Sequence, residues 1–142
     1  MSIANFSGPA ARQRRVSHNL KGRSLASLKK LAWKLLSLKI RRQASNSWGY
    51  CKCYTCGVTK RYQELQAGHA IPGRRGAVLF DEDIIKPQCV ACNVFNHGRL
   101  DIFATNLIRL HGLDWWEDKL QASRQVRKWS RAELEQLIER YS

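Results

Sequence analysis

The chain has 142 residues, a formal net charge of +14 and a hydrophobic content of 44%. This length suits one compact domain with a tail. No run of 18 apolar residues occurs, so we expect no membrane span, and the N-terminus lacks the apolar core of a signal peptide. We therefore expect an intracellular protein, whose five cysteines indicate metal ligands or thiols rather than disulfides.

The positive charge is concentrated in the first half of the chain. Residues 1–61 contain fourteen Lys or Arg and no acid, whereas eleven basic and eleven acidic residues cancel from Glu64 onward. Such asymmetry favours a polyanionic partner, most commonly nucleic acid. The alternative is a solvated basic tail that has no specific partner.

The N-terminal third combines a basic arm with a predicted helix. Residues 1–23 are rich in Gly, Ser and Arg without periodicity, which indicates a flexible arm. Ser24 is the expected cap of a helix over residues 24–43, whose leucines and Ala32 recur at helical spacing. We expect its basic residues to contact DNA phosphates, although an ordinary amphipathic helix with solvated side chains has the same pattern. These residues are Lys29, Lys30, Lys34 and Arg41.

Residues 48–98 contain two C-x2-C pairs, 32 residues apart. Two residues between thiols allow both to bind one ion from a tight turn, and two such turns complete a tetrahedral site. Four thiolates suit Zn²⁺, and a closed site of this kind is structural. The four ligands are Cys53, Cys56, Cys89 and Cys92. Cys51 could displace Cys53, but the spacing favours Cys53, so we expect Cys51 to be a strand residue.

The segment 101–142 is predicted to be helical. Asp101 is the expected cap of a helix that ends near Gly112, and the paired tryptophans that follow are expected in an acidic turn as core anchors. The S-x-x-E pattern that begins at Ser130 is a capping box. Apolar residues at i, i+3, i+4 and i+7 then predict a docked terminal helix.

Three polar residues lie between the two cysteine pairs or just after the second pair. A nuclease needs a base to deprotonate water and a divalent cation to stabilise charge on the scissile phosphate. A neutral imidazole, whose unperturbed pKa is about 6.5, is a suitable base near neutral pH. His69 is the candidate for this role. Asn93 and His97 have i, i+4 spacing and would share a helix face. Each residue also has a structural alternative: a strand histidine, a helix N-cap and a helix-end residue.

The order of these motifs resembles a known family. The succession C-x2-C, GH and C-x2-C-N is similar to zinc-containing HNH endonucleases. The longer series CYTCG, AGHAI, FDED and PQCVACN resembles the NinG/Rap recombination nucleases of lambdoid phages, and the similarity covers roughly residues 25–142. It implies an α+β fold: a zinc-stapled ββα-metal (HNH) core at 48–98, flanked by N- and C-terminal helices within one domain at 24–142.

The resemblance also implies a reaction. A β-hairpin would carry His69 as the general base, and the next helix would carry Asn93, with or without His97, as ligand of a catalytic Mg²⁺ or Mn²⁺. The implied enzyme is an endodeoxyribonuclease that leaves 5′-phosphate and 3′-hydroxyl ends. Its implied substrates are branched recombination intermediates, such as Holliday junctions or D-loops. A phage-encoded enzyme would act on them in the cytoplasm of the host cell.

Two positions depart from the usual HNH pattern. Many HNH enzymes place a metal ligand just before the base, where this chain has Gly68, so the ligand must come from elsewhere or from water. Asp81, Glu82 and Asp83 are candidates. Ile84 stands where an Asn usually orients the base.

The substrate contacts and the competing functions follow from the same residues. Arg74 and Arg75 are candidates for active-site phosphate contacts, or form an exposed basic loop. A preference for branched DNA would require two active sites at one junction, which favours a homodimer. The competing function is a non-catalytic, zinc-stabilised DNA-binding protein, which needs neither His69 nor Asn93. A third is an RNA-binding or protein-interaction zinc module.

Overall fold

The computed structural model describes residues 20–72 and 76–142, and these form two compact units. The first unit contains residues 20–36 and 129–142, and the second contains residues 37–128. Helix α2 (Leu25–Gln43) contributes residues to both. The mixed α+β class expected from the sequence is confirmed. No helix among the described residues has the length and apolar character needed to cross a membrane.

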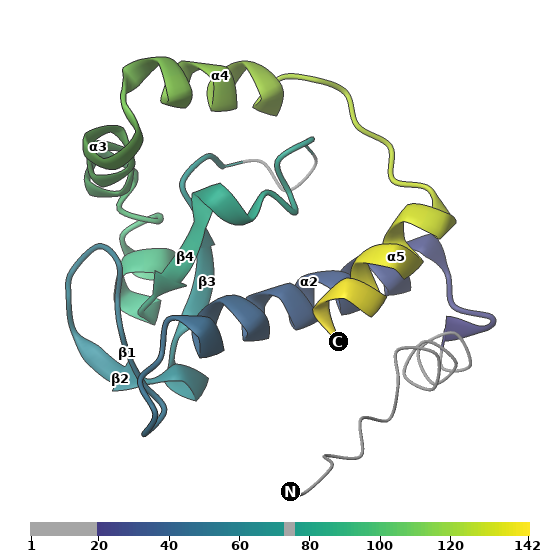
Figure 1. The fold of residues 1–142 in the computed structure, drawn as a ribbon, viewed down its shortest axis with the longest axis horizontal. Coiled ribbons are helices and arrows are strands. Elements are labelled where there is room, and N and C mark those ends of the chain that lie inside the picture. The colour runs from purple at the N-terminus through teal and green to yellow at the C-terminus, as the bar shows by residue number, and fades with distance from the viewer. Residues whose placement is uncertain (1–19, 73–75) are drawn as a thin grey trace, which may run out of the picture. The chain divides into compact units, whose positions relative to one another are not determined.

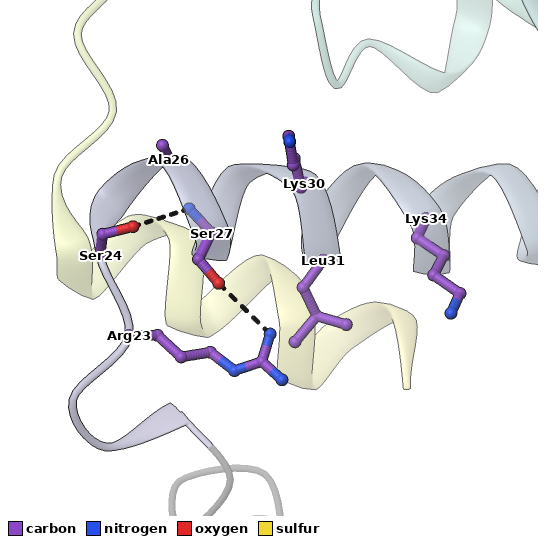
Figure 2. Close-up of a pocket in the computed structure, with 7 residues that line it drawn as sticks. All are labelled: Arg23, Ser24, Ala26, Ser27, Lys30, Leu31 and Lys34. Carbon is purple, nitrogen blue, oxygen red and sulfur yellow. Dashed lines mark hydrogen bonds between the residues drawn. The ribbon is translucent and has the colours of Figure 1, made fainter.

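The first unit pairs the N-terminal part of α2 with helix α5 (Arg131–Tyr141), and Figures 1 and 2 both show them side by side. Ser24 caps α2 as predicted, since its Oγ accepts from the Ser27 N–H at 3.1 Å. Ser130 forms the predicted capping box with Glu133 at the start of α5. The buried residues recur at helical spacing on both helices: Leu28, Ala32, Leu36, Leu134, Ile138 and Tyr141.

The second unit contains two antiparallel β-hairpins, which Figure 1 shows in teal tones. Their strands are β1 (Tyr50–Lys52), β2 (Thr59–Arg61), β3 (Gln66–His69) and β4 (Ile85–Gln88). Short helical turns join or follow them: η1 (Tyr62–Glu64), η2 (Glu82–Ile84) and η3 (Ala91–Phe95), the last of which is π-helical. The register of the second hairpin pairs Gln66 with Gln88 and His69 with Ile85.

Two helices complete the second unit, α3 (Leu100–His111) and α4 (Leu113–Ser123). Asp101 is not the N-cap of α3, because the helix begins one residue earlier and Arg99 occupies the cap. The tryptophan pair lies within α4 rather than in a turn. The reason is that Gly112, at a φ of +93°, reverses the chain within one residue, so a new helix starts at once.

Candidate functional site

The four predicted cysteine ligands converge on one point in the second unit. The sulfur atoms of Cys53, Cys56, Cys89 and Cys92 all lie within 4.8 Å of one another. Sulfur atoms at about 2.3 Å from a tetrahedral zinc are about 3.8 Å apart, and the Cys56 and Cys89 sulfurs are separated by 3.7 Å. The four residues are therefore positioned to bind a metal ion, and the all-sulfur donor set is consistent with structural zinc.

Each cysteine pair is shaped by a tight turn. In the first turn the Gly57 N–H donates to the Cys53 carbonyl at 2.9 Å, and Gly57 has a φ of +78°, a conformation that favours glycine. In the second turn the Cys92 N–H donates to the Cys89 sulfur at 3.4 Å. Both bonds fold the chain back so that the two sulfurs of a pair point the same way.

The thiol pKa values show how strongly the four groups interact. Burial by itself raises the pKa of Cys53, but hydrogen bonds from the Thr55 hydroxyl and from nearby backbone N–H groups lower it to about 6. A hydrogen bond from the Val58 backbone lowers the pKa of Cys56, but burial and the three neighbouring thiols raise it to about 12. The cluster therefore supports one thiolate easily, and the next only when a cation is bound to offset the repulsion.

Cys51 lies outside the cluster. It is the middle residue of β1, is buried, and pairs with Lys60 of β2. The expectation that it is a strand residue is confirmed.

His69 is the last residue of β3 and is half-buried. Its Nε2 lies 3.0 Å from the carbonyl oxygen of Leu79. A carbonyl can only accept, so Nε2 donates the hydrogen bond, and in the neutral ring the lone pair is on Nδ1. Ile84 is fully buried and has no polar group to orient the imidazole. The backbone of Leu79 does so instead, which the sequence pattern did not indicate.

Asn93 lies on the η3 turn that follows the second cysteine pair. Its N–H donates to the Cys89 carbonyl at 2.9 Å, and its Nδ2 donates to Gln66 Oε1 at 2.8 Å. The Asn93 oxygen Oδ1 lies 2.9 Å from the position that a Cβ would occupy at Gly68. Asn93 is thus held against the same strand that carries His69.

Gln88 is a polar residue that our sequence reasoning missed. It is fully buried, and its Nε2 donates to the Gly98 carbonyl at 2.8 Å and to Thr55 Oγ1 at 3.1 Å. Its Oε1 lies only 1.8 Å from the Cβ position of Gly68. A signal existed, because a glycine within a strand often marks the close approach of another group.

The i, i+4 spacing predicts that His97 and Asn93 share a helix face. This prediction is wrong. The helix expected after the second cysteine pair is the single π-helical turn η3, which ends at Phe95. His97 lies beyond it, exposed, at a φ of +53°. Among the described residues, the four cysteines form the one group of three or more His, Cys, Asp or Glu side chains that could hold a metal ion.

The three acidic residues proposed as substitutes for a ligand at position 68 are all paired with lysines. Lys119 Nζ lies 2.7 Å from Asp81 Oδ2 and 3.0 Å from Asp83 Oδ2. Lys39 Nζ lies 3.0 Å from Glu82 Oε1. Asp81 also caps η2. These carboxylates stabilise the loop before β4, and the structure gives the role of missing ligand to none of them.

The first unit carries the exposed basic residues of α2. Lys29, Lys30 and Lys34 are exposed, and the last two line a groove of about 550 Å³ together with Arg23, Ser24, Ala26, Ser27 and Leu31. Figure 2 shows these side chains along α2, with Ser27 hydrogen-bonded to both Ser24 and Arg23. The described lining contains three basic residues and no acidic one.

The other predicted DNA contacts have different positions. Arg41 belongs to the second unit and donates to the carbonyls of Ser37 at 3.1 Å and Tyr62 at 2.9 Å. Burial lowers the pKa of Arg41. This guanidinium therefore has a structural role in joining the end of α2 to η1. Arg74 and Arg75 lie outside the described residues.

Fold and site together define a small α+β protein organised around a tetracysteine metal-binding cluster. The chain belongs to the NinG family: the family model described as bacteriophage lambda NinG protein matches residues 9–142. Searches of curated proteins and of solved structures found no significant match.

Proposed function

We propose that this protein is a metal-dependent DNA endonuclease of the HNH type, acting on branched recombination DNA. The NinG family is linked to phage recombination, which supports the substrate class. The observation that carries the proposal is the segment β3–β4–η3, in which two hairpin strands and a helical turn hold a histidine and an asparagine. The tetracysteine cluster, with zinc as its metal, would join the turn between β1 and β2 to the turn between β4 and η3.

His69 is the proposed general base. Its Nε2 hydrogen bond to Leu79 fixes the tautomer in which Nδ1 accepts a proton, so the ring needs no side-chain partner to be set for catalysis. His69 would take a proton from water, and the oxygen of that water would attack phosphorus. The P–O3′ bond would then break and O3′ would take a proton from solvent, which leaves a 5′-phosphate and a 3′-hydroxyl.

Asn93 is the proposed ligand of the catalytic cation. Its Oδ1 is an oxygen donor of the kind that Mg²⁺ and Mn²⁺ prefer. Such a cation supplies stabilisation of the charge on the scissile phosphate and on the leaving oxygen. In-line attack places the water and the leaving oxygen on opposite sides of phosphorus. The base and the cation ligand should therefore flank the phosphate, not touch each other, and alternation along β3 puts His69 and Gly68 on opposite faces.

The groove on α2 is the proposed site for the DNA backbone. Lys29, Lys30 and Lys34 would neutralise phosphates without reading sequence, which suits a substrate defined by its branch point. Arg41, Arg74 and Arg75 remain further proposed DNA contacts. Cleavage of both strands at a junction requires two active sites, so we also propose that the protein acts as a homodimer.

The test is a cleavage assay on labelled four-way, Y-shaped and linear DNA with Mg²⁺, Mn²⁺ or EDTA. We expect cleavage that needs the cation and is lost in His69→Ala and Asn93→Ala. His111→Ala is the matched control, because His111 is exposed and stacks on Trp115 at 4.0 Å. If His97→Ala retained activity, His97 would not be needed as a ligand of the cation, and Asn93 alone of the two would have that role. Binding without cleavage under every metal would refute the enzyme and favour the non-catalytic DNA-binding protein.

A second test concerns the groove. Lys30→Gln with Lys34→Gln should weaken binding to all three DNA substrates alike and reduce the slope of log K against log salt by about 2, one unit for each lost phosphate contact. The control, Arg124→Gln with Lys128→Gln, removes the same two charges at exposed sites outside the groove. Equal slopes for the control and the groove variant would remove the groove from the proposal.

A further inference from the structure

The Gln88 side chain is buried in a way that fixes the direction of its oxygen. Both hydrogens of its amide nitrogen are used, one by the Gly98 carbonyl and one by Thr55 Oγ1. The oxygen must therefore point the other way, towards Gly68. Since the residue is 0% exposed, neither rotation nor bulk water offers this oxygen an alternative partner.

That oxygen is an acceptor without a donor. No hydrogen-bond donor for Gln88 Oε1 exists among the described residues, although the atom is buried. A buried amide oxygen without a partner costs about 1–3 kcal/mol, and such atoms in native proteins need an explanation, for example a functional role or a bound ion. A weak contact with the Gly68 Cα–H recovers only part of this.

Gln88 and Asn93 present two oxygens to the same place. Gln88 Oε1 lies 1.8 Å, and Asn93 Oδ1 2.9 Å, from the Cβ position at Gly68. We call the space beside the Gly68 Cα, between these two oxygens, the cradle; any side chain at position 68 would fill it. Gln88 lies on the neighbouring strand, two residues from the partner of Gly68. Because Gly68 has no side chain, the amide oxygen of Gln88 can occupy the place where that side chain would begin.

We infer that Gln88 Oε1 is the second protein ligand of the divalent cation bound by Asn93 Oδ1. This inference rests on the proposed function for the catalytic use of the cation, but not for its binding. Two neutral amide oxygens form a hard, uncharged donor set, which suits Mg²⁺ or Mn²⁺. Because Gln88 is fully buried, water and a substrate phosphate would complete the coordination from the side of the half-buried Asn93. The cation would bind weakly to the free protein and more tightly with DNA present.

The donor set also explains why Gly68 is compatible with a cation site. A carboxylate at position 68 would reach the cation from β3, whereas here the amide of Gln88 reaches it from β4. The ligand missing from the sequence pattern is thereby supplied from the opposite strand, 20 residues further along the chain. Gln88 is neutral where many HNH enzymes have a charged ligand, so we expect a lower affinity for the cation. The neutral amide also avoids the free-energy cost of burying a charge.

The experiment measures Mn²⁺ binding alone, by electron paramagnetic resonance on zinc-loaded protein without DNA. Gln88→Met keeps the size of the side chain and removes the oxygen, and should weaken Mn²⁺ binding about tenfold or more, as should Asn93→Ala. Gln63→Met is the matched control, since Gln63 is exposed on η1, and should leave binding unchanged.

The outcomes separate this inference from the proposed function. Unchanged Mn²⁺ binding in Gln88→Met, with loss in Asn93→Ala, would overturn the role of Gln88 and leave the endonuclease intact. Loss in both variants, with no DNA cleavage by the native protein, would support the site and refute the enzyme. If Gln88→Met fails to retain zinc or to unfold cooperatively, Thr55→Val decides, because it keeps Oε1 but removes one of the two acceptors that fix the amide: weaker Mn²⁺ binding than in Thr55→Ser supports the inference and equal binding overturns it. No Mn²⁺ binding by the native protein also overturns it.

Discussion

Gly68→Ala is the smallest change that tests the packing of the cradle. The added Cβ would lie 1.8 Å from Gln88 Oε1 and 2.7 Å from its Cδ. The amide is buried and anchored by two hydrogen bonds, so it cannot swing aside without losing them. Overpacking costs about 1–3 kcal/mol, and an amide displaced from its acceptors costs about 1–3 kcal/mol. Together these contributions should lower the free energy of unfolding of Gly68→Ala by about 2–6 kcal/mol.

The sign of the effect is informative, because Ala normally stabilises a strand by about 0.5–1 kcal/mol relative to Gly. Urea unfolding of the zinc-loaded protein measures the change. The control is a double-mutant cycle with Gln88→Ala, which removes the two nearest colliding atoms. In that background Gly68→Ala should cost much less, because only Asn93 Oδ1, at 2.9 Å, remains close to the added Cβ. An equal cost in both backgrounds would refute the reasoning.

Three further predictions concern the metal cluster, one ion pair and one helix cap. Cys56→Ser should abolish stoichiometric zinc, measured by mass spectrometry, and remove the cooperative unfolding of the second unit; one retained zinc per chain would contradict the cluster. Burial lowers the pKa of Lys119, but the hydrogen bonds that it donates to Asp81 and Asp83 raise this pKa overall. The stabilisation that this lysine gives is therefore present below its unfolded pKa and is lost as pH rises through its folded pKa. Lys119→Met should therefore be less stable than the native protein by about 1–2 kcal/mol at pH 7, with the gap closing above about pH 10.5; a gap independent of pH would argue against the ion pairs. Ser130→Ala should destabilise α5 by about 1 kcal/mol, seen as a lower thermal midpoint, whereas Ser130→Asp should restore it.

The features that the sequence predicted are those set by local spacing. Helix α2 begins after Ser24 and ends at Gln43, as its leucine periodicity indicates. The capping box at Ser130 needs only residues three apart. The cysteine cluster joins positions far apart in sequence, yet each pair is a local turn, and the demand for four sulfurs around one ion brings the two turns together.

The features that it could not predict depend on contacts between distant segments. The acidic cluster before β4 reads as a set of cation ligands, but Lys119, 36 residues beyond Asp83, neutralises two of its members. The segment after Cys92 has helical spacing, but the π-helical turn and the positive φ of His97 end it early. The residues around Gln88 have the pattern of an ordinary strand, which does not indicate that Gln88 is buried. The reason is visible only in the folded hairpin, where Gly68 has no side chain and leaves room for the Gln88 amide.

Thr55 connects the metal cluster to the cradle. Its Oγ1 lies 3.5 Å from Cys53 Sγ and accepts from Gln88 Nε2 at 3.1 Å. A thiolate can only accept, so the hydroxyl donates to sulfur and accepts from the amide, which uses both of its capacities at once. Occupation of the cluster therefore orients the hydroxyl, and the hydroxyl holds the amide that aims Oε1 at the cradle.

These two hydrogen bonds would couple a metal bound by the cysteines to the proposed cation site. Thr55→Val has nearly the same shape but leaves the Gln88 amide with one acceptor in place of two, and should destabilise the native state by about 1–3 kcal/mol. It should also weaken Mn²⁺ binding, because the amide is no longer fixed, while Thr55→Ser should preserve both properties. Chelator competition for zinc and electron paramagnetic resonance for Mn²⁺ measure the two effects on the same samples. If Thr55→Val lowered zinc affinity and left Mn²⁺ binding as it is in Thr55→Ser, the cluster and the cradle would be energetically independent.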